Sequence, residues 1–325
     1  MVSGQISNKT LNEWDKFSHS EKIEILRLIC GEYGTILKRR FSSILAIGLG
    51  FKTKGNFVVK DLCLAFLVKE KKDGKPRPVP PAIKFSLNFR GKRTRLAIPT
   101  DVEELGEGKP HAVVNVAGGI HAVLAQNPQI GIFGSACCVV SQDDNAQNRY
   151  VLGCHHVLAL SLLTRDCDAE DGYLQVGNQT IGRLYEYLPM SASGQACIDA
   201  AIAILDPDVP VIWEQPNIAP SNVSPGITQP SNCWVFSPNG PLQAEFVREW
   251  ADVPLNYPNA GTVIIRAAYQ FSADTKPGHS GSPIMEPDGT LHGMHFWGDS
   301  SRRMSFAIPA FVLFQPGLFS VSFNL

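Results

Sequence analysis

The sequence predicts a mainly β protein with an α+β segment at its amino-terminal end, and three observations support this division. Beyond Pro110, short apolar runs alternate with clusters of Gly, Pro, Asn and Asp, a pattern typical of a β-barrel or β-sandwich. Before Pro110, apolar residues recur at helical spacing between Phe17 and Arg40, and strand-like runs follow. The charge also changes sign near this point, because residues 1–110 carry 21 Lys and Arg against 12 Asp and Glu, and residues 111–325 carry 8 against 18. We therefore expect a basic domain over 1–110 and an acidic domain over 111–325.

The elements of the amino-terminal domain follow from local patterns. One or two helices are expected between Phe17 and Arg40, with Ser18 or Ser20 available as the N-cap. Strand-like runs are found at Ser43–Gly50, Phe57–Val68 and Arg95–Pro99, and the stretch Lys52–Asn56 favours a hairpin turn between the first two.

The carboxy-terminal domain shows little helical periodicity before Pro309–Phe314. Ten prolines lie between Asp206 and Pro258, which predicts a linker and exposed loops inside the β domain.

The composition is that of an ordinary globular protein with a sizeable core, because 44% of the 325 residues are hydrophobic and 18% are charged. Residues 1–17 lack a basic-then-apolar signal, and no apolar run approaches the roughly 18 residues of a membrane span. We therefore expect a cytoplasmic protein that makes no contact with a membrane. Eight cysteines are too few for a disulfide scaffold in a chain of this length, and we expect thiols.

Three segments of the carboxy-terminal domain carry the residue types of an acyl-transfer site. They are Tyr150–Ala159 with the paired His155 and His156, Cys197–Leu205 with Asp199, and Lys276–Ile284 with Ser280. A serine hydroxyl is a weak nucleophile, so it needs a histidine to accept its proton and a carboxylate to hold the imidazole in the right tautomer. The backbone N–H groups of Gly278 and Ser280 are candidates for an oxyanion hole, because glycine lets the backbone approach the reacting carbonyl closely.

The order His, Asp, Ser, together with Gly-His-Ser-Gly-Ser-Pro from Gly278 to Pro283, resembles the trypsin/chymotrypsin-like serine peptidases over roughly residues 118–315. The run Ala-Ile-Ala-Ile-Leu after Asp199 also resembles a strand of that family. The resemblance implies a chymotrypsin-like double β-barrel and a serine endopeptidase that needs no cofactor. It implies Ser280 as nucleophile, Asp199 as the orienting acid, and His156 rather than His155 as the base, since the family places an aliphatic residue after this histidine, as Val157 is here.

The resemblance fails at one position. His279 precedes the serine, where zymogen-activated members carry an acid that pairs with a newly formed amino terminus. We therefore do not expect that mode of activation, and control would come from the basic domain over 1–110 or from a regulatory partner that it binds.

Two specificities compete at the substrate pocket. Asp274 lies six residues before Ser280, where trypsins hold the acid that selects Arg or Lys. Thr275 and His295 instead resemble the residues with which glutamyl endopeptidases grip Glu or Gln, and both side chains can donate to a carboxylate or amide oxygen. Two matched positions favour cleavage after Glu or Gln, with Arg or Lys second.

Other functions fit less well. The basic clusters Lys38–Arg40, Lys69–Lys72 and Arg90–Arg95 have few interleaved aromatics, so a solvated or docking face is favoured over nucleic-acid binding. The Cys137-Cys138 and Cys154-His155-His156 groups lack the ligand spacing of a zinc site, so no metal is expected. The main alternative to an enzyme is a catalytically silent, protease-like protein that holds a peptide in its groove.

Overall fold

A computed structural model describes residues 13–41, 43–54, 57–69, 79–106, 109–110, 119–142, 145–164, 168–192, 194–209, 220–227, 232–258 and 261–323. The chain divides into two compact units. The first comprises Met1–Leu105 together with Val247–Ala251, and the second comprises Gly106–Phe246 and Asp252–Leu325. The sequence contains no signal for the five residues that the carboxy-terminal half contributes to the first unit.

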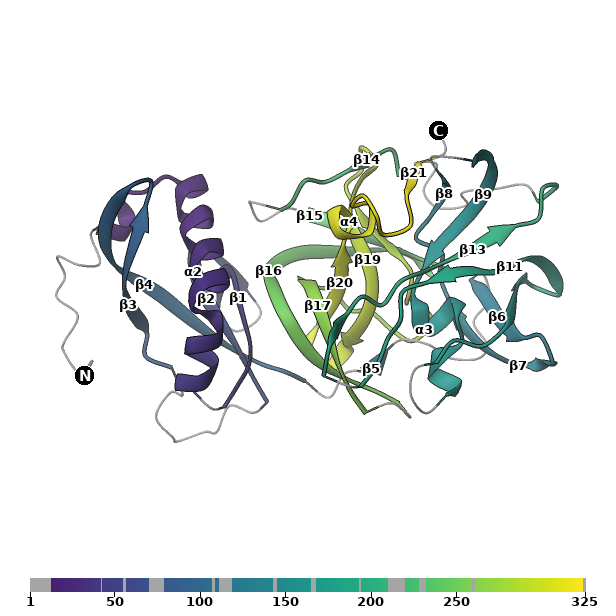
Figure 1. Cartoon of the computed structure of the whole chain (residues 1–325), viewed down its shortest axis with the longest axis horizontal. Helices are drawn as coiled ribbons and strands as arrows, with labels where there is room; N and C mark the ends of the chain where they lie inside the picture. Colours follow the sequence, from purple (N-terminus) through teal and green to yellow (C-terminus); the bar gives the residue numbers. More distant parts are fainter. Residues whose placement is uncertain are drawn as a thin grey trace. The chain divides into compact units, whose positions relative to one another are not determined.

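The first unit is a mixed β-sheet with a helix on one face (Figure 1). Its elements are α2 (His19–Arg40), β1 (Ile44–Lys54), β2 (Phe57–Val68), β3 (Ala82–Phe89) and β4 (Lys92–Glu104). The sheet order is β1-β2-β4-β3, and residues 248–251 pair antiparallel with β1. Only the β2–β4 pair is parallel among the described pairs of this unit.

The helix α2 is a single helix with a complete N-terminal cap. Ser18 is the N-cap, and its side chain and that of Glu21 bond reciprocally to the backbone in a capping box. Of the two serines considered from the sequence, Ser18 therefore serves as the cap. The buried face includes Ile25 and Leu26, and this face covers β1 and β2 (Figure 1).

The strands differ from the sequence-based expectations in one element. The runs Ser43–Gly50 and Phe57–Val68 correspond to β1 and β2, and Arg95–Pro99 lies within β4. Strand β3 was missed, although its buried apolar residues alternate with exposed Lys, Ser and Asn, which is the pattern of a half-buried strand. Residues 55–56 of the expected turn Lys52–Asn56 lie outside the described residues, while Lys54 and Phe57 form the last antiparallel pair of β1 and β2.

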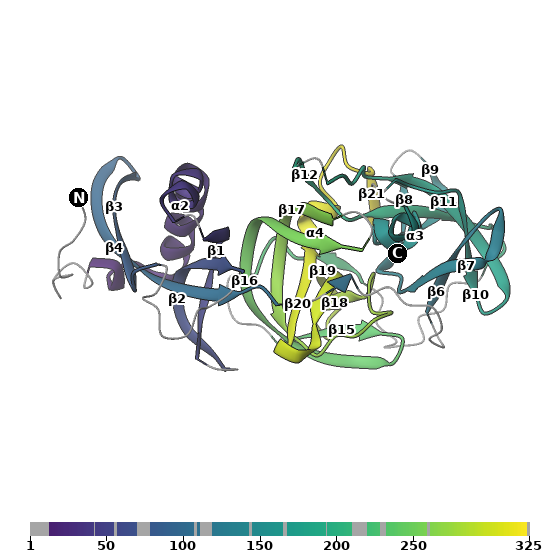
Figure 2. The same ribbon diagram turned by 90° about the horizontal axis from the view of Figure 1, so that it is seen from below.

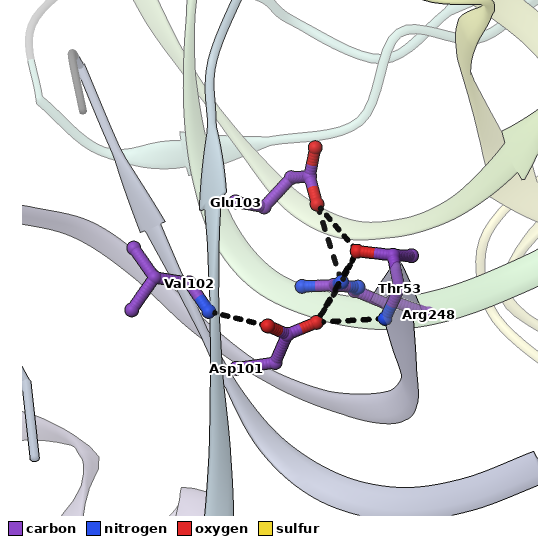
Figure 3. Close-up of polar contacts among 5 residues, drawn as sticks. All are labelled: Thr53, Asp101, Val102, Glu103 and Arg248. Atoms are coloured by element: carbon purple, nitrogen blue, oxygen red, sulfur yellow. Dashed lines mark hydrogen bonds and ion pairs between the residues drawn. The ribbon is translucent and has the colours of Figure 1, made fainter. Parts of the chain in front are cut away.

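A buried guanidinium joins residues 247–251 to the first unit (Figure 3). Arg248 is fully buried, and its Nη2 lies 2.6 Å from an oxygen of Asp101 and 3.2 Å from one of Glu103. Asp101 also accepts hydrogen bonds from the backbone N–H groups of Thr53 and Val102, at 2.9 and 3.0 Å. The cluster joins β1, β4 and residues 247–251 through one arginine.

We predict that Asp101→Ala lowers the unfolding free energy by about 3 kcal/mol, because it leaves the Arg248 charge buried with one weaker partner. Glu103→Ala is the matched control and should cost roughly 1 kcal/mol, since Glu103 makes the longer ion pair and accepts fewer hydrogen bonds. Urea unfolding followed by tryptophan fluorescence measures both. Equal losses for the two variants would contradict this ranking.

The carboxy-terminal part of the second unit is a β-barrel. Its strands are β15 (Asn232–Ser237), β16 (Gly240–Tyr257), β17 (Gly261–Ser272), β18 (Pro283–Met285), β19 (Thr290–Asp299) and β20 (Met304–Pro309). They pair in the order β17-β20-β19-β18-β15-β16, and a further pairing between β16 and β17 closes the ring. Figure 2 shows these strands, in green and yellow, curving around one another. Short strands β5 (Lys109–Pro110), β12 (Ala196–Cys197) and β14 (Asn222–Val223) are added at its edges.

The second sheet of this unit has eight strands in the order β21-β8-β9-β13-β11-β10-β6-β7. They are β6 (Ile120–Leu124), β7 (Asn127–Gly134), β8 (Cys138–Gln142), β9 (Asn145–Gly153), β10 (Gly172–Val176), β11 (Gln179–Tyr187), β13 (Ala201–Leu205) and β21 (Val321–Phe323). The helical segments of the unit are short: α3 (His155–Leu158), α4 (Ala310–Leu313) and two 3-10 turns, Ser161–Leu163 and Ser300–Arg302. The predicted fold class is confirmed in its main features: the protein is mainly β, with two β-sheets in the second unit and an α+β part before them.

The proline-rich stretch between Asp206 and Pro258 contains strands as well as the expected loops, because β15 and the long β16 lie there. Residues 210–219 and 228–231 of the stretch lie outside the described residues, and only two of the described prolines belong to these strands. Pro241 is the second residue of β16, and Pro254 follows Asp252, whose φ of 52° interrupts the regular strand. Prolines at a strand start and beside an irregularity do not remove hydrogen bonds that a regular strand needs.

None of the helices among the described residues is long and apolar enough to cross a membrane.

Candidate active site

Two neighbouring strands bring His156 and Asp199 together. Residue Gly153 at the end of β9 pairs with Ala201 at the start of β13, so the residues just after the first strand meet those just before the second. The Nδ1 of His156 lies 2.5 Å from Oδ2 of Asp199, and the His156 backbone N–H donates to Oδ1 at 3.1 Å. Both side chains are fully buried. The aspartate therefore holds the histidine through both its ring and its backbone.

Asp199 is an ionised carboxylate in a dry environment. Burial alone raises its pKa, but the charge of His156 and hydrogen bonds from His156 and from the hydroxyl of Tyr257 outweigh burial and hold the pKa below its ordinary value. The Tyr257 hydroxyl donates to Oδ2 at 2.7 Å. With Asp199 ionised and bonded to Nδ1, the neutral form of the imidazole has its proton on Nδ1 and a free lone pair on Nε2.

Ser280 lies in a turn between β17 and β18 that only glycine can form. Gly278 and Gly281 on either side of the serine have φ values of 92° and 95°. A Cβ at Gly281 would lie 1.8 Å from the carbonyl oxygen of Ser135. Ser135 also holds the turn by hydrogen bonds, since its N–H donates to the Ser280 carbonyl at 2.6 Å and its hydroxyl to the Gly278 carbonyl at 3.0 Å.

Gly134 lies close both to Ser280 and to Val157, the residue after His156. A Cβ at Gly134 would be 2.7 Å from a methyl group of Val157 and 2.9 Å from the Ser280 carbonyl oxygen. The Ser280 hydroxyl donates to the Phe296 carbonyl at 3.3 Å, and Nε2 of His156 has no hydrogen-bond partner among the described residues. The structure thus bonds His156 to Asp199 and the Ser280 hydroxyl to the Phe296 carbonyl.

Two backbone amides in the turn are available to a ligand. Across the described parts of the chain, neither the N–H of Gly278 nor that of Ser280 donates to a backbone carbonyl. Amides left unpaired in a buried turn favour an acceptor supplied from outside, such as a carbonyl oxygen that gains negative charge.

His155 has different partners from its neighbour. Its Nδ1 lies 2.9 Å from the hydroxyl of Ser161, and its ring lies edge-on to Tyr187 at 5.4 Å between centroids. Burial lowers its pKa to about 4, so it is a neutral residue at physiological pH. Asp199 bonds to the side chain of His156 and not to that of His155.

The three expected pocket residues differ in burial. Thr275 and His295 are buried, whereas Asp274 is exposed. The Nδ1 of His295 lies 2.8 Å from the hydroxyl of Ser305, and the His295 carbonyl accepts from the Gly281 N–H at 2.7 Å, which places this histidine against the serine turn. The hydroxyl of Thr275 is buried without a hydrogen-bond partner among the described residues.

A possible metal-binding group overlaps the same residues. Ligand atoms of Cys154, His156 and Asp199 lie within 4.8 Å of one another. However, Nδ1 of His156 is already bonded to Asp199, and burial raises the pKa of the Cys154 thiol well above its ordinary value. A neutral thiol is a poor metal ligand, so the donor set fits a metal badly.

Sequence reasoning missed two residues of this site, Ser135 and Tyr257. Ser135 precedes Ala136 and two cysteines, and Tyr257 lies 58 residues after Asp199 at the end of β16. Neither belongs to a motif, and only the strand pairing brings each to its partner.

The sequence matches no protein-family model and no curated protein. Among solved structures, the chain is similar to Thermobifida fusca Protease A, with a TM-score of 0.44 and 15% identity over 64% of this chain and 97% of that chain. It is similar to Nocardiopsis protease, with a TM-score of 0.43 and 14% identity over 64% and 98% of the two chains. It is also similar to a glutamic acid specific serine protease that uses a histidine triad in substrate binding, with a TM-score of 0.42 and 13% identity over 63% and 97%. The function is therefore inferred from the geometry of this chain's own residues.

The low pKa of His155 predicts that acid destabilises the protein. Its folded pKa of about 4 lies below the ordinary 6.5, so the unfolded chain binds the extra proton as the pH falls between these values. Protonation of His155 in the unfolded chain should therefore lower the free energy of unfolding by up to roughly 1 kcal/mol for each unit that the pH falls in this window. His155→Asn should show a shallower fall than the wild type in urea unfolding between about pH 7 and pH 4.5. The same substitution at the exposed His19 controls for the change itself, and a slope unaltered by His155→Asn would refute the assignment.

Proposed function

We propose that the protein is a serine endopeptidase that hydrolyses protein substrates through an acyl-enzyme. Ser280 Oγ attacks the peptide carbonyl carbon while Nε2 of His156 accepts the hydroxyl proton. The N–H groups of Gly278 and Ser280 stabilise the oxyanion. The tetrahedral intermediate then collapses, the amine leaves with the proton from His156, and water releases the acid by the same steps in reverse.

The observation that carries the proposal is the buried His156–Asp199 bond at 2.5 Å, together with the glycine-flanked Ser280 in a turn that lies close to Gly134, as does Val157, the residue after His156. A carboxylate buried with a histidine costs free energy that packing alone does not return, so such a pair is retained for a chemical task more readily than a surface pair. The free Nε2 of His156 is the atom that accepts a proton in this mechanism.

The amino-terminal unit supplies none of these groups. We propose that residues 1–110 are a regulatory or docking domain, supported by their net positive charge beside an acidic remainder. Removing them to test this would also strip the partner strands from residues 248–251, so point variants on exposed basic residues are the better experiment.

The alternative is a silent protease-like protein that only binds peptides, and the Ser280 hydrogen bond to Phe296 is compatible with it. We expect a fluorophosphonate probe to label Ser280 in the wild type, and His156→Ala to slow labelling about a thousandfold or more, because the hydroxyl then loses its base. His155→Ala is the matched control and should be labelled at nearly the wild-type rate. If the folded wild type is not labelled in any condition, the silent peptide-binding protein is favoured. If only His155→Ala abolishes labelling, the general base is His155 and not His156.

The preferred substrates are proposed to carry Glu or Gln before the cleaved bond. The buried Thr275 hydroxyl and the buried His295 ring can both donate hydrogen bonds to the side-chain oxygen of a Glu or Gln, which supports this preference. Asp274 is exposed, which does not favour a pocket that binds the positive charge of Arg or Lys. In a peptide library, His295→Ala should reduce cleavage after Glu or Gln by about tenfold to a hundredfold, the effect of a lost hydrogen bond to a charged group. Asp274→Ser should leave the profile unchanged. Cleavage mainly after Arg or Lys, abolished by Asp274→Ser and indifferent to His295→Ala, would overturn the preference.

A further inference from the structure

Tyr257 is the last residue of β16, and its side chain reaches the acid of the proposed triad. Its ring is buried, and its hydroxyl donates to Oδ2 of Asp199 at 2.7 Å. The same oxygen lies 2.5 Å from Nδ1 of His156, so one carboxylate oxygen serves two donors. The other oxygen accepts from the His156 backbone. Every hydrogen bond described for the Asp199 side chain therefore comes from His156 or Tyr257.

We propose that Tyr257 is a positioning residue, which acts through Asp199 to set both the orientation and the basicity of His156. This inference rests on the proposed function for its kinetic consequences. The hydroxyl fixes the carboxylate in the plane that receives Nδ1, and it draws part of the Oδ2 charge away from the imidazole.

The chemistry of the contact makes Tyr257 a permanent donor. Burial and the neighbouring Asp199 charge raise the pKa of Tyr257 well above its ordinary value, so the phenol keeps its proton throughout the working range of an enzyme. Its ring lies edge-on to that of His156, with 5.9 Å between centroids and an interplanar angle of 71°. The tyrosine thus restrains the imidazole by contact as well as through the shared oxygen.

Few other titratable groups face this pair. Among the described residues, the groups that act on Asp199 or Tyr257 besides these two and His156 are His155, Cys154 and Cys197. His155 has a pKa of about 4, and burial raises the pKa of Cys154 well above its ordinary value and that of Cys197 to about 11. All three are neutral near pH 7, so a difference between variants in the pH profile reports on His156 and its two partners.

The kinetic test is Tyr257→Phe, which removes the hydroxyl and keeps the ring. We expect kcat to fall about tenfold to a hundredfold with KM nearly unchanged, the effect of losing one hydrogen bond to a charged group. The acid limb of the pH profile of kcat/KM should move to higher pH, because Asp199 then directs more of its charge to the imidazolium. Tyr269→Phe removes another buried hydroxyl of the same barrel, which accepts from the Ile227 N–H, and should leave the limb in place.

A second measurement does not depend on catalysis. In the Ser280→Ala background, NMR titration of His156 should show a higher pKa when Tyr257→Phe is added, and no change with Tyr269→Phe. Should Tyr257→Phe fail to fold, site-specific 3-fluorotyrosine at position 257 keeps the hydroxyl, makes it a stronger donor and should lower the His156 pKa instead. An unchanged His156 pKa in the folded variant overturns the inference and leaves the peptidase intact. Absence of labelling in the wild type overturns the peptidase, while the titration still decides the role of Tyr257.

Discussion

The hydrogen bond between His156 and Asp199 is the contact around which the second unit is arranged. Burying this carboxylate costs free energy that is recovered only if its donors lie in place. The structure supplies them from the backbone and ring of His156 and from Tyr257. The register of β9 against β13 and the course of β16 bring these donors to the carboxylate.

Strand β16 has a role in both units. Residues 247–251 belong to the first unit, where Arg248 is buried against Asp101 and Glu103 (Figure 3), and the strand ends at Tyr257 in the second. The interruption at Asp252, with its φ of 52°, falls at the point where the strand passes from one unit to the other. One continuous strand thus carries an arginine that depends on the first unit and a tyrosine bonded to Asp199.

The local features of this structure were predictable from the sequence, and the non-local ones were not. The capping box at Ser18 and Glu21 and the glycine-flanked turn at Ser280 are encoded within a few residues, so local patterns reveal them. Tyr257 and Arg248 carry no local signal, because their importance comes from strands that pair across long stretches of sequence. The same holds for the strands in the proline-rich stretch, where composition indicates loops and only the pairing shows where a proline is tolerated.

The turn around Ser280 is held by contacts within the chain. The Lys276 N–H donates to Nδ1 of His279 at 3.2 Å, and the His279 N–H donates to the Lys276 carbonyl at 3.1 Å, which closes the turn ahead of the serine. For Nδ1 to accept, this imidazole must be neutral, and burial together with the nearby Lys276 charge lowers its pKa to about 4. Ser135 holds the far side of the same turn through the Gly278 and Ser280 carbonyls. His279 is thus bonded within its own turn, and four hydrogen bonds within the chain hold the turn on both sides of Ser280.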